Sequence, residues 1–141
     1  MSSNKHINTT IIFLCFLIVT VATLGSLFFS EIMHFIPCSM CWYQRIFMYP
    51  LVLIFLINLL YPDDKVFKYA IGLVVVGLLF SIYHNLLMFD IIPPSVVPCV
   101  SGVPCSTVYI NWLGFITIPL LSFIAYFALF ILLLIGKKNE K

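Results

Sequence analysis

The sequence predicts an all-α membrane protein, a four-transmembrane-helix bundle with two extracytoplasmic loops. Of its 141 residues, 63% are hydrophobic and only 9% are charged, whereas a soluble domain carries roughly 25% charged residues. With a mean hydropathy of +1.18, the chain has too few polar residues to cover its surface in water. The net charge of +2 and the absence of a basic cluster argue against nucleic-acid binding.

Four apolar runs account for the helices, and each is close to the roughly 20 residues that a bilayer span needs. Helices are expected because they satisfy their own backbone polar groups within lipid. We expect a single membrane domain over residues 1–141, with spans at about 10–30, 42–61, 67–89 and 113–136 and outer loops at about 31–41 and 90–112. The short polar turn after Tyr61 makes the second and third spans antiparallel neighbours.

The lysines predict the orientation of the bundle. Six of the seven basic residues lie in the terminal segments or around the turn between the second and third spans: Lys5, Lys65, Lys68, Lys137, Lys138 and Lys141. The positive-inside rule then places both termini of this multi-pass protein of the cell membrane in the cytoplasm. Two cysteine pairs, Cys38 with Cys41 and Cys99 with Cys105, fall on the outer face. That side favours disulfides, because cytosolic thiols are kept reduced.

Cys38 and Cys41 form a C-x-x-C pair where the second span begins. Two thiols at this spacing can close a disulfide, and the pair is a common redox unit. Pro37 suits a helix edge, so the amides at the start of the helix are expected to favour thiolates. Arg45 lies one helical turn beyond Cys41 on the same face. Its guanidinium could hold a thiolate or donate hydrogen bonds to a flat, lipid-soluble acceptor.

Cys99 and Cys105 lie in the second outer loop with five residues between them. Closing so short a loop would add little stability, which is compatible with a reactive disulfide. A structural staple remains an alternative for each pair. A zinc site made of all four outer thiolates is a further alternative, but an oxidising compartment disfavours it, and we predict no metal.

Two other residues in the spans carry chemistry. His84 lies in the outer half of the third span, where an ionisable side chain is a candidate for function. It could donate a hydrogen bond to a reducible ring, or serve only as a hydrogen-bonding residue of the bundle. Arg45 could likewise do no more than extend to the membrane interface. Cys15, in the inner half of the first span, is expected to be a buried structural residue.

The segment Pro37-Cys38-Ser39-Met40-Cys41-Trp42-Tyr43-Gln44-Arg45 resembles the P-C-x-x-C-x-x-x-R motif of the DsbB/BdbC family of membrane disulfide-bond formation proteins. Tyr83-His84 and the segment from Gly114 to Pro119 are also similar to that family, and the order of the two cysteine pairs is the same. The short spacing of the second pair resembles the Gram-positive BdbC branch.

The resemblance implies a quinone-dependent, protein-disulfide-generating oxidoreductase. Its partner would be an extracytoplasmic thioredoxin-fold thiol oxidase, DsbA/BdbD-like, and its electron acceptor a membrane quinone. Menaquinone or ubiquinone would serve, and the likeness to BdbC favours menaquinone.

The resemblance also implies the roles of the cysteines, with disulfides Cys38–Cys41 and Cys99–Cys105. Cys99 would form the mixed disulfide with the partner, and Cys105 would then attack towards Cys38. Cys41 would face the quinone. The quinone would be held by Arg45, with His84 as a second candidate.

Two rival interpretations remain. Vitamin K epoxide reductase-like proteins also combine membrane spans, a loop pair and a C-x-x-C beside a quinone. They place the C-x-x-C after the loop cysteines, whereas here it precedes them. The second rival is a non-enzymatic four-span scaffold whose outer loops are stapled by permanent disulfides.

Overall fold

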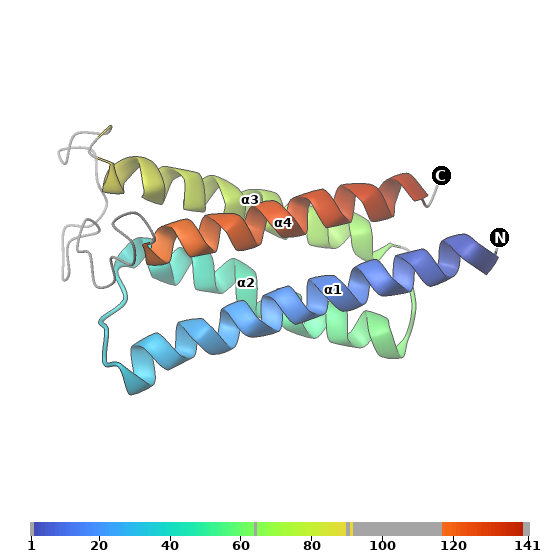
Figure 1. Ribbon diagram of the computed structural model, residues 1–141, viewed down its shortest axis with the longest axis horizontal. Helices are drawn as coiled ribbons and strands as arrows, with labels where there is room; N and C mark the ends of the chain where they lie inside the picture. Colours follow the sequence, from blue (N-terminus) through green and yellow to red (C-terminus); the bar gives the residue numbers. More distant parts are fainter. Residues whose placement is uncertain (1, 64, 90, 92–116, 140–141) are drawn as a thin grey trace.

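The long helices of the described residues, four in number, lie side by side along the molecule (Figure 1). The computed structural model describes residues 2–63, 65–89, 91 and 117–139. Within them the elements are α1 (Ser2–Leu27), the π-helical turn η1 (Phe28–Ile32), α2 (Ser39–Leu60), α3 (Val66–Met88) and α4 (Ile118–Asn139). A helix of 22 residues, such as α2, is about 33 Å long at 1.5 Å per residue. All four helices are long and apolar enough to cross a membrane, which confirms the predicted fold class.

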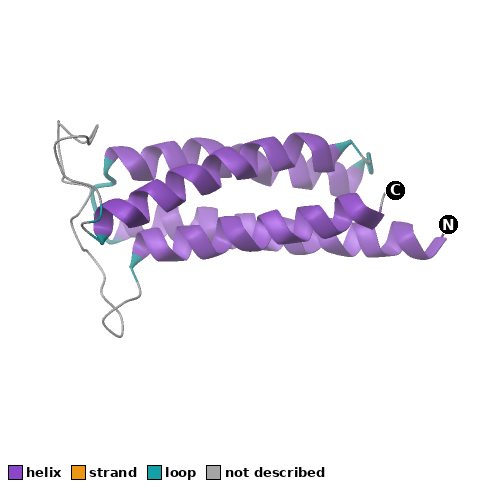
Figure 2. Ribbon diagram, turned by 90° about the horizontal axis from the view of Figure 1, so that it is seen from above, coloured by secondary structure: helices purple, strands orange, loops and turns teal. Residues whose placement is uncertain are grey.

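The helices alternate in direction and close a ring. The main contacts join α1 to α2, α2 to α3, α3 to α4, and α4 back to α1. Both termini and the α2–α3 turn lie at the same end of the bundle (Figures 1 and 2), as the lysine pattern requires. The start of α2, the end of α3 and the start of α4 lie at the other end. Which end faces the cytoplasm remains a prediction.

The helix bounds differ from the expected spans most at the start of α1 and the start of α4, which begins at Ile118 rather than near residue 113. Smaller differences occur at the start of α2 and the end of α4. Helix α1 begins at Ser2 rather than near residue 10, and the part of it that suits a membrane begins at His6. Helix α4 continues to Asn139, with Lys137 and Lys138 in its last turn. Hydrophobicity reveals only the apolar part of a helix. Because both helices continue into polar sequence, their outer ends lie beyond the apolar runs. Lysines near a helix C-terminus also stabilise the helix through its dipole.

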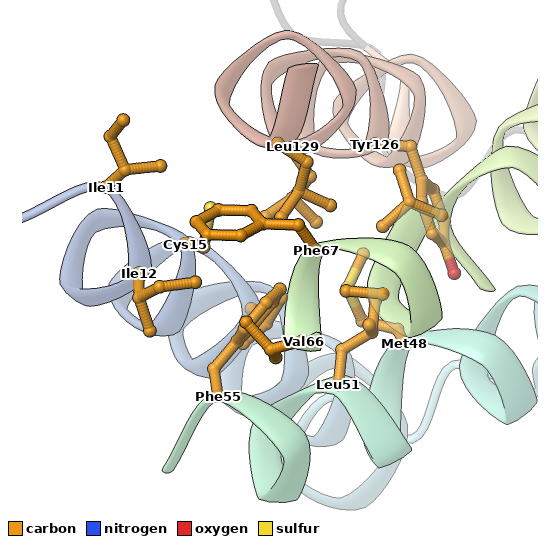
Figure 3. Packing of buried hydrophobic residues seen from close by; sticks show 14 residues of the cluster. Ile11, Ile12, Cys15, Met48, Leu51, Phe55, Val66, Phe67, Tyr126 and Leu129 are labelled. Carbon is orange, nitrogen blue, oxygen red and sulfur yellow. The ribbon is translucent and has the colours of Figure 1, made fainter. Parts of the chain in front are cut away.

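The core lies between all four helices, and it is apolar. Figure 3 shows Cys15, Phe55, Phe67 and Leu129, from four different helices, pointing towards one another. Cys15 is fully buried in this cluster, in agreement with the structural role expected for it. Large apolar side chains such as Val21, which is 69% exposed, cover the outside. An apolar exterior suits contact with lipid.

Close packing between α3 and α4 depends on glycine. A methyl group at Gly77 would collide with the ring of Tyr126, whereas one at Gly72 would meet nothing within 4 Å. Small residues at such positions let membrane helices approach closely. The absence of a side chain at Gly77 therefore leaves room for the Tyr126 ring to lie against α3. From there the Tyr126 hydroxyl reaches the backbone carbonyl of Gln44 in α2.

Candidate active site

The C-x-x-C pair lies at the N-terminus of α2, where the sequence predicts it. Cys38 is the N-cap residue, with an extended backbone (φ −71°, ψ 168°). Its carbonyl accepts a hydrogen bond from the amide of Trp42 at 3.2 Å. The sulfurs of Cys38 and Cys41 are 3.2 Å apart as free thiols. A disulfide between them therefore needs little movement of the chain, although the Cys38–Cys41 pairing itself remains a prediction.

His84 reaches the dithiol from α3. Its ring is 1% exposed, and its Nε2 atom lies 3.7 Å from the sulfur of Cys38, which is itself 7% exposed. The antiparallel arrangement of α2 and α3 brings the end of one helix beside the start of the other. The structure thus brings together two residues that are 46 positions apart in the chain.

Two residues that the sequence does not single out support His84: Gln44 contacts its ring directly, and Tyr126 contacts Gln44. The amide nitrogen of Gln44 lies 3.3 Å from Nδ1 of His84. The hydroxyl of Tyr126 donates a hydrogen bond of 2.7 Å to the backbone carbonyl of Gln44. A chain of contacts therefore runs from α4 through α2 to the imidazole. Gln44 could have been found in the sequence as a polar side chain in an apolar span, but the contact with Tyr126 depends on helix packing.

The surroundings of Cys38 favour its thiolate. The thiol of Cys41, within hydrogen-bond distance, lowers the pKa of Cys38 well below its ordinary value. Burial opposes this shift, and the imidazole of His84 adds to it through a hydrogen bond and its charge. The thiolate is the nucleophile in thiol–disulfide chemistry. The neighbours of Cys38 therefore stabilise its thiolate form in the reduced pair.

Arg45 makes its contacts with α1 and with Trp42. Its Nη2 atom donates a hydrogen bond of 2.9 Å to the backbone carbonyl of Ser26. Its guanidinium carbon lies 5.5 Å from the centre of the Trp42 ring. The sequence predicts a shared face for Arg45 and Cys41, and both do line one cavity. Its hydrogen bond to Ser26, however, also joins α1 to α2, which the spacing alone does not reveal.

A cavity of about 650 Å³ connects these groups. Most of its wall is apolar and comes from α1, the α1–α2 link, α2 and the start of α4. Its main polar side chains are Cys38, Cys41, Gln44, Arg45, Tyr49 and His84. The hydroxyl of Tyr49 is buried and has no hydrogen-bond partner among the described residues. A mostly apolar cavity with a few convergent polar groups is typical of a small-molecule site.

The second cysteine pair lies outside the described residues. The positions of Cys99 and Cys105, their predicted disulfide and their predicted roles all remain predictions, as does most of the second outer loop. Of the predicted site residues that the structure describes, Cys38, Cys41, Arg45 and His84 all line the same cavity. Gln44, Tyr49 and Tyr126 join them there.

Comparison with known proteins points to one family. The family model described as "Disulfide bond formation protein DsbB" matches residues 8–136. The chain is 51% identical to disulfide bond formation protein C of Bacillus subtilis, over 87% of this chain and 91% of that protein. It is 46% identical to the probable disulfide formation protein C of Halalkalibacterium halodurans, over 83% of this chain and 87% of the relative. No solved structure matches the chain significantly.

Proposed function

We propose that this chain, which belongs to the DsbB family of disulfide bond formation proteins, reoxidises an extracytoplasmic thioredoxin-fold thiol oxidase and passes the electrons to a membrane quinone. Membership of the family confirms the resemblance seen in residues 37–45 and makes the chain a disulfide-forming oxidoreductase of the membrane. The thiol oxidase and the quinone are the proposed part. The observation that carries it is that the dithiol of Cys38 and Cys41, His84 and Arg45 line one mostly apolar cavity.

The cavity fits the electron acceptor in size and chemistry. Its volume of about 650 Å³ lies within the roughly 300–1,000 Å³ of small-molecule pockets. Val21, Leu121 and Ile124 line it and are also exposed on the outside of the bundle. An isoprenoid tail could therefore leave the cavity directly into lipid while the ring stays beside the dithiol. Menaquinone is the quinone we propose, as the resemblance to the BdbC branch implies.

Three side chains can bind the carbonyl oxygens of such a ring. Arg45 carries donors that cannot be deprotonated. The Tyr49 hydroxyl is buried without a partner among the described residues, and a bound carbonyl oxygen would satisfy it. His84 lies at the dithiol end of the cavity and can move a proton between the sulfurs and the acceptor. Together these three side chains would hold the ring in one orientation beside the dithiol.

The electrons balance over three exchanges. The partner's dithiol becomes a disulfide as the Cys99–Cys105 disulfide is reduced. Cys99 and Cys105 then return to a disulfide as the Cys38–Cys41 disulfide is reduced. Finally Cys38 and Cys41 close again, and two electrons and two protons pass to the quinone, which becomes the quinol. The first two steps are thiol–disulfide exchanges, in which the reduced pair supplies the attacking thiolate. The thiolate favoured at Cys38 belongs to the reduced pair that enters the last step.

A coupled assay tests the proposal. The purified protein is mixed with a reduced thioredoxin-fold oxidase and a soluble menaquinone analogue, and quinone absorbance and free thiols are followed together. We expect one quinone to be consumed for every two thiols lost, and we expect Cys41→Ser to stop both. Cys15→Ala, which changes a core thiol, should turn over normally. If a range of oxidases and quinones gave no turnover while both cysteine pairs stayed oxidised, the stapled scaffold would be the better account.

A further inference from the structure

We infer that the reduced dithiol and His84 form a three-ligand site for a thiophilic divalent cation such as Zn²⁺, and that the bound ion blocks the site. The sequence suggested only a zinc site built from all four outer thiolates. In the described part of the chain, the two sulfurs of Cys38 and Cys41 and a ring nitrogen of His84 all lie within 4.8 Å of one another. This group needs neither Cys99 nor Cys105.

The distances suit a tetrahedral ion. Zinc–sulfur and zinc–nitrogen bonds of about 2.3 and 2.0 Å imply edges of about 3.8 Å between two sulfurs and about 3.5 Å between sulfur and nitrogen. The observed separations are 3.2 Å between the sulfurs and 3.7 Å from Cys38 to Nε2 of His84. The sulfur of Cys41 and the ring nitrogen of His84 lie within 4.8 Å of each other, so side-chain movements of about 1 Å would complete the site. Two cysteines, one histidine and one open position form a known zinc arrangement.

The second layer of the site also suits a metal. A histidine ligand usually donates its other ring N–H to an acceptor, which orients the ring. Here Gln44 lies 3.3 Å from Nδ1 of His84. Because the oxygen and nitrogen of an amide exchange places by a simple flip, the Gln44 oxygen can accept the Nδ1 proton while Nε2 binds the ion. The same amide can thus serve both the metal-free and the metal-bound site.

The charges balance in the bound state. The ligands bind as thiolates, and two thiolates cancel the charge of a divalent ion, so the loaded site is neutral within a mostly apolar cavity. The positive charge of the Arg45 guanidinium is therefore not repelled by the loaded site. Cys38, Cys41 and His84 all line the cavity, so the fourth ligand position opens towards the space proposed for the quinone. An ion there would hold the dithiol reduced and stop its reoxidation.

Metal binding goes beyond the proposed function and does not depend on it, whereas the block of reoxidation does. The test uses the full-length Cys99→Ser/Cys105→Ser variant, reduced with a phosphine, so that the second pair contributes no ligands. Co²⁺ alone is added first as a spectroscopic probe, and Zn²⁺ is then used to displace it. We expect one Co²⁺ per chain with thiolate charge-transfer bands and tetrahedral visible bands, and no binding after oxidation.

Matched variants separate this site from other ligands. His84→Ala should weaken Zn²⁺ binding by at least about 100-fold, since losing a ligand costs more than the roughly 10–100-fold typical of an outer partner. Gln44→Leu should weaken it by about tenfold. His34→Ala, which changes an exposed histidine in the α1–α2 link, should leave it unchanged. Equal affinity in His84→Ala and its parent would overturn the inference.

A second measurement needs no change at His84. X-ray absorption of the zinc-loaded parent variant should show two sulfur ligands and at least one imidazole. A shell without imidazole, or binding that appears only when Cys99 and Cys105 are present, would contradict the site. Inhibition is measured separately as loss of quinone reduction when Zn²⁺ is added to the reduced protein. If Zn²⁺ binds but the metal-free protein reduces no quinone, the proposed function fails while the metal site stands.

Discussion

Cys15 and Cys38 are both buried thiols, yet the two regions that hold them differ. Cys15 is 0% exposed and packs within the apolar core of the bundle. Cys38 is 7% exposed, but its sulfur lies 3.2 Å from Cys41 and 3.7 Å from His84. Burial is therefore nearly the same in the two regions, and the neighbouring groups make the difference. A free cysteine in apolar surroundings behaves as a small hydrophobe, whereas polar partners and a helix N-terminus prepare a thiol for exchange.

The largest expected effect separates these two regions by activity. Cys38→Ala should reduce coupled quinone reduction to the rate without protein, because no disulfide can form beside the acceptor. Cys15→Ala should keep wild-type turnover and cost only about 1 kcal/mol of stability, as expected for a small cavity in a core. Steady-state quinone absorbance and thermal unfolding in detergent measure the two quantities. Normal turnover of Cys38→Ala would remove the dithiol from the mechanism.

The second prediction concerns pH and the lowered pKa of Cys38. In a Cys41→Ser/Cys99→Ser/Cys105→Ser variant, the serine hydroxyl keeps a donor beside Cys38. Between pH 7.5 and 6, alkylation of an ordinary thiol slows about 30-fold, because its pKa is near 8.5 and only the thiolate reacts. Because the pKa of Cys38 is lowered, its thiolate persists as the pH falls, and its rate should change little over this interval.

Iodoacetamide labelling followed by mass spectrometry checks this pH dependence. Cys15 provides an internal reference and should stay unmodified until the protein is denatured. Replacing Cys41 by alanine instead of serine removes the donor, so the rate at Cys38 should then fall more steeply with pH. A 30-fold loss of rate in the serine variant would show that the neighbours of Cys38 do not stabilise its thiolate.

A smaller effect is expected at Arg45, the charged side chain of the cavity wall. Hydrogen bonds to charged groups contribute about 1.5–3 kcal/mol, so Arg45→Ala should raise the KM for a soluble quinone by roughly tenfold or more. Exchange with the partner oxidase in a quinone-free single turnover should be unaffected. Arg45→Lys keeps the charge, so its KM for the quinone should lie between those of the wild type and Arg45→Ala. An unchanged KM in Arg45→Ala would limit the residue to its contact with Ser26.

The smallest effect concerns the packing that supports the site from the core. Gly77→Ala should lower the free energy of unfolding by about 1–3 kcal/mol, because overpacking forces Tyr126 to move. Gly72→Ala, on the same helix but with open space around it, should stay within about 0.5 kcal/mol of wild type. Unfolding in detergent compares them. Equal stability of the two variants would mean that the Tyr126 ring can move away from position 77 at little cost in stability.

The sequence predicts the helices well because a membrane span has a simple physical signature. Long apolar runs and lysine-rich ends are enough to place four spans and to bring both termini to one end. The helix bounds at Ser2 and Asn139 were less predictable, because helices continue into polar sequence where hydrophobicity carries no signal.

The site was predictable only in part. The C-x-x-C spacing and a histidine within a span single out Cys38, Cys41 and His84 one by one, but their common cavity depends on how α2 and α3 align. The contact of Arg45 with Ser26 and that of Tyr126 with Gln44 join different helices. Neighbours of this kind are set by packing, which no local pattern records. The roles of Cys99 and Cys105 rest on the family likeness alone.

The most direct test of the account is an anaerobic single turnover of the Cys99→Ser/Cys105→Ser protein, fully reduced and mixed with a soluble menaquinone analogue. Quinone absorbance gives the electrons transferred, and mass spectrometry of the products locates any new disulfide. The account predicts one quinone reduced per chain, a disulfide between Cys38 and Cys41, and a free thiol at Cys15. A folded, reduced protein that leaves the quinone unchanged would contradict it.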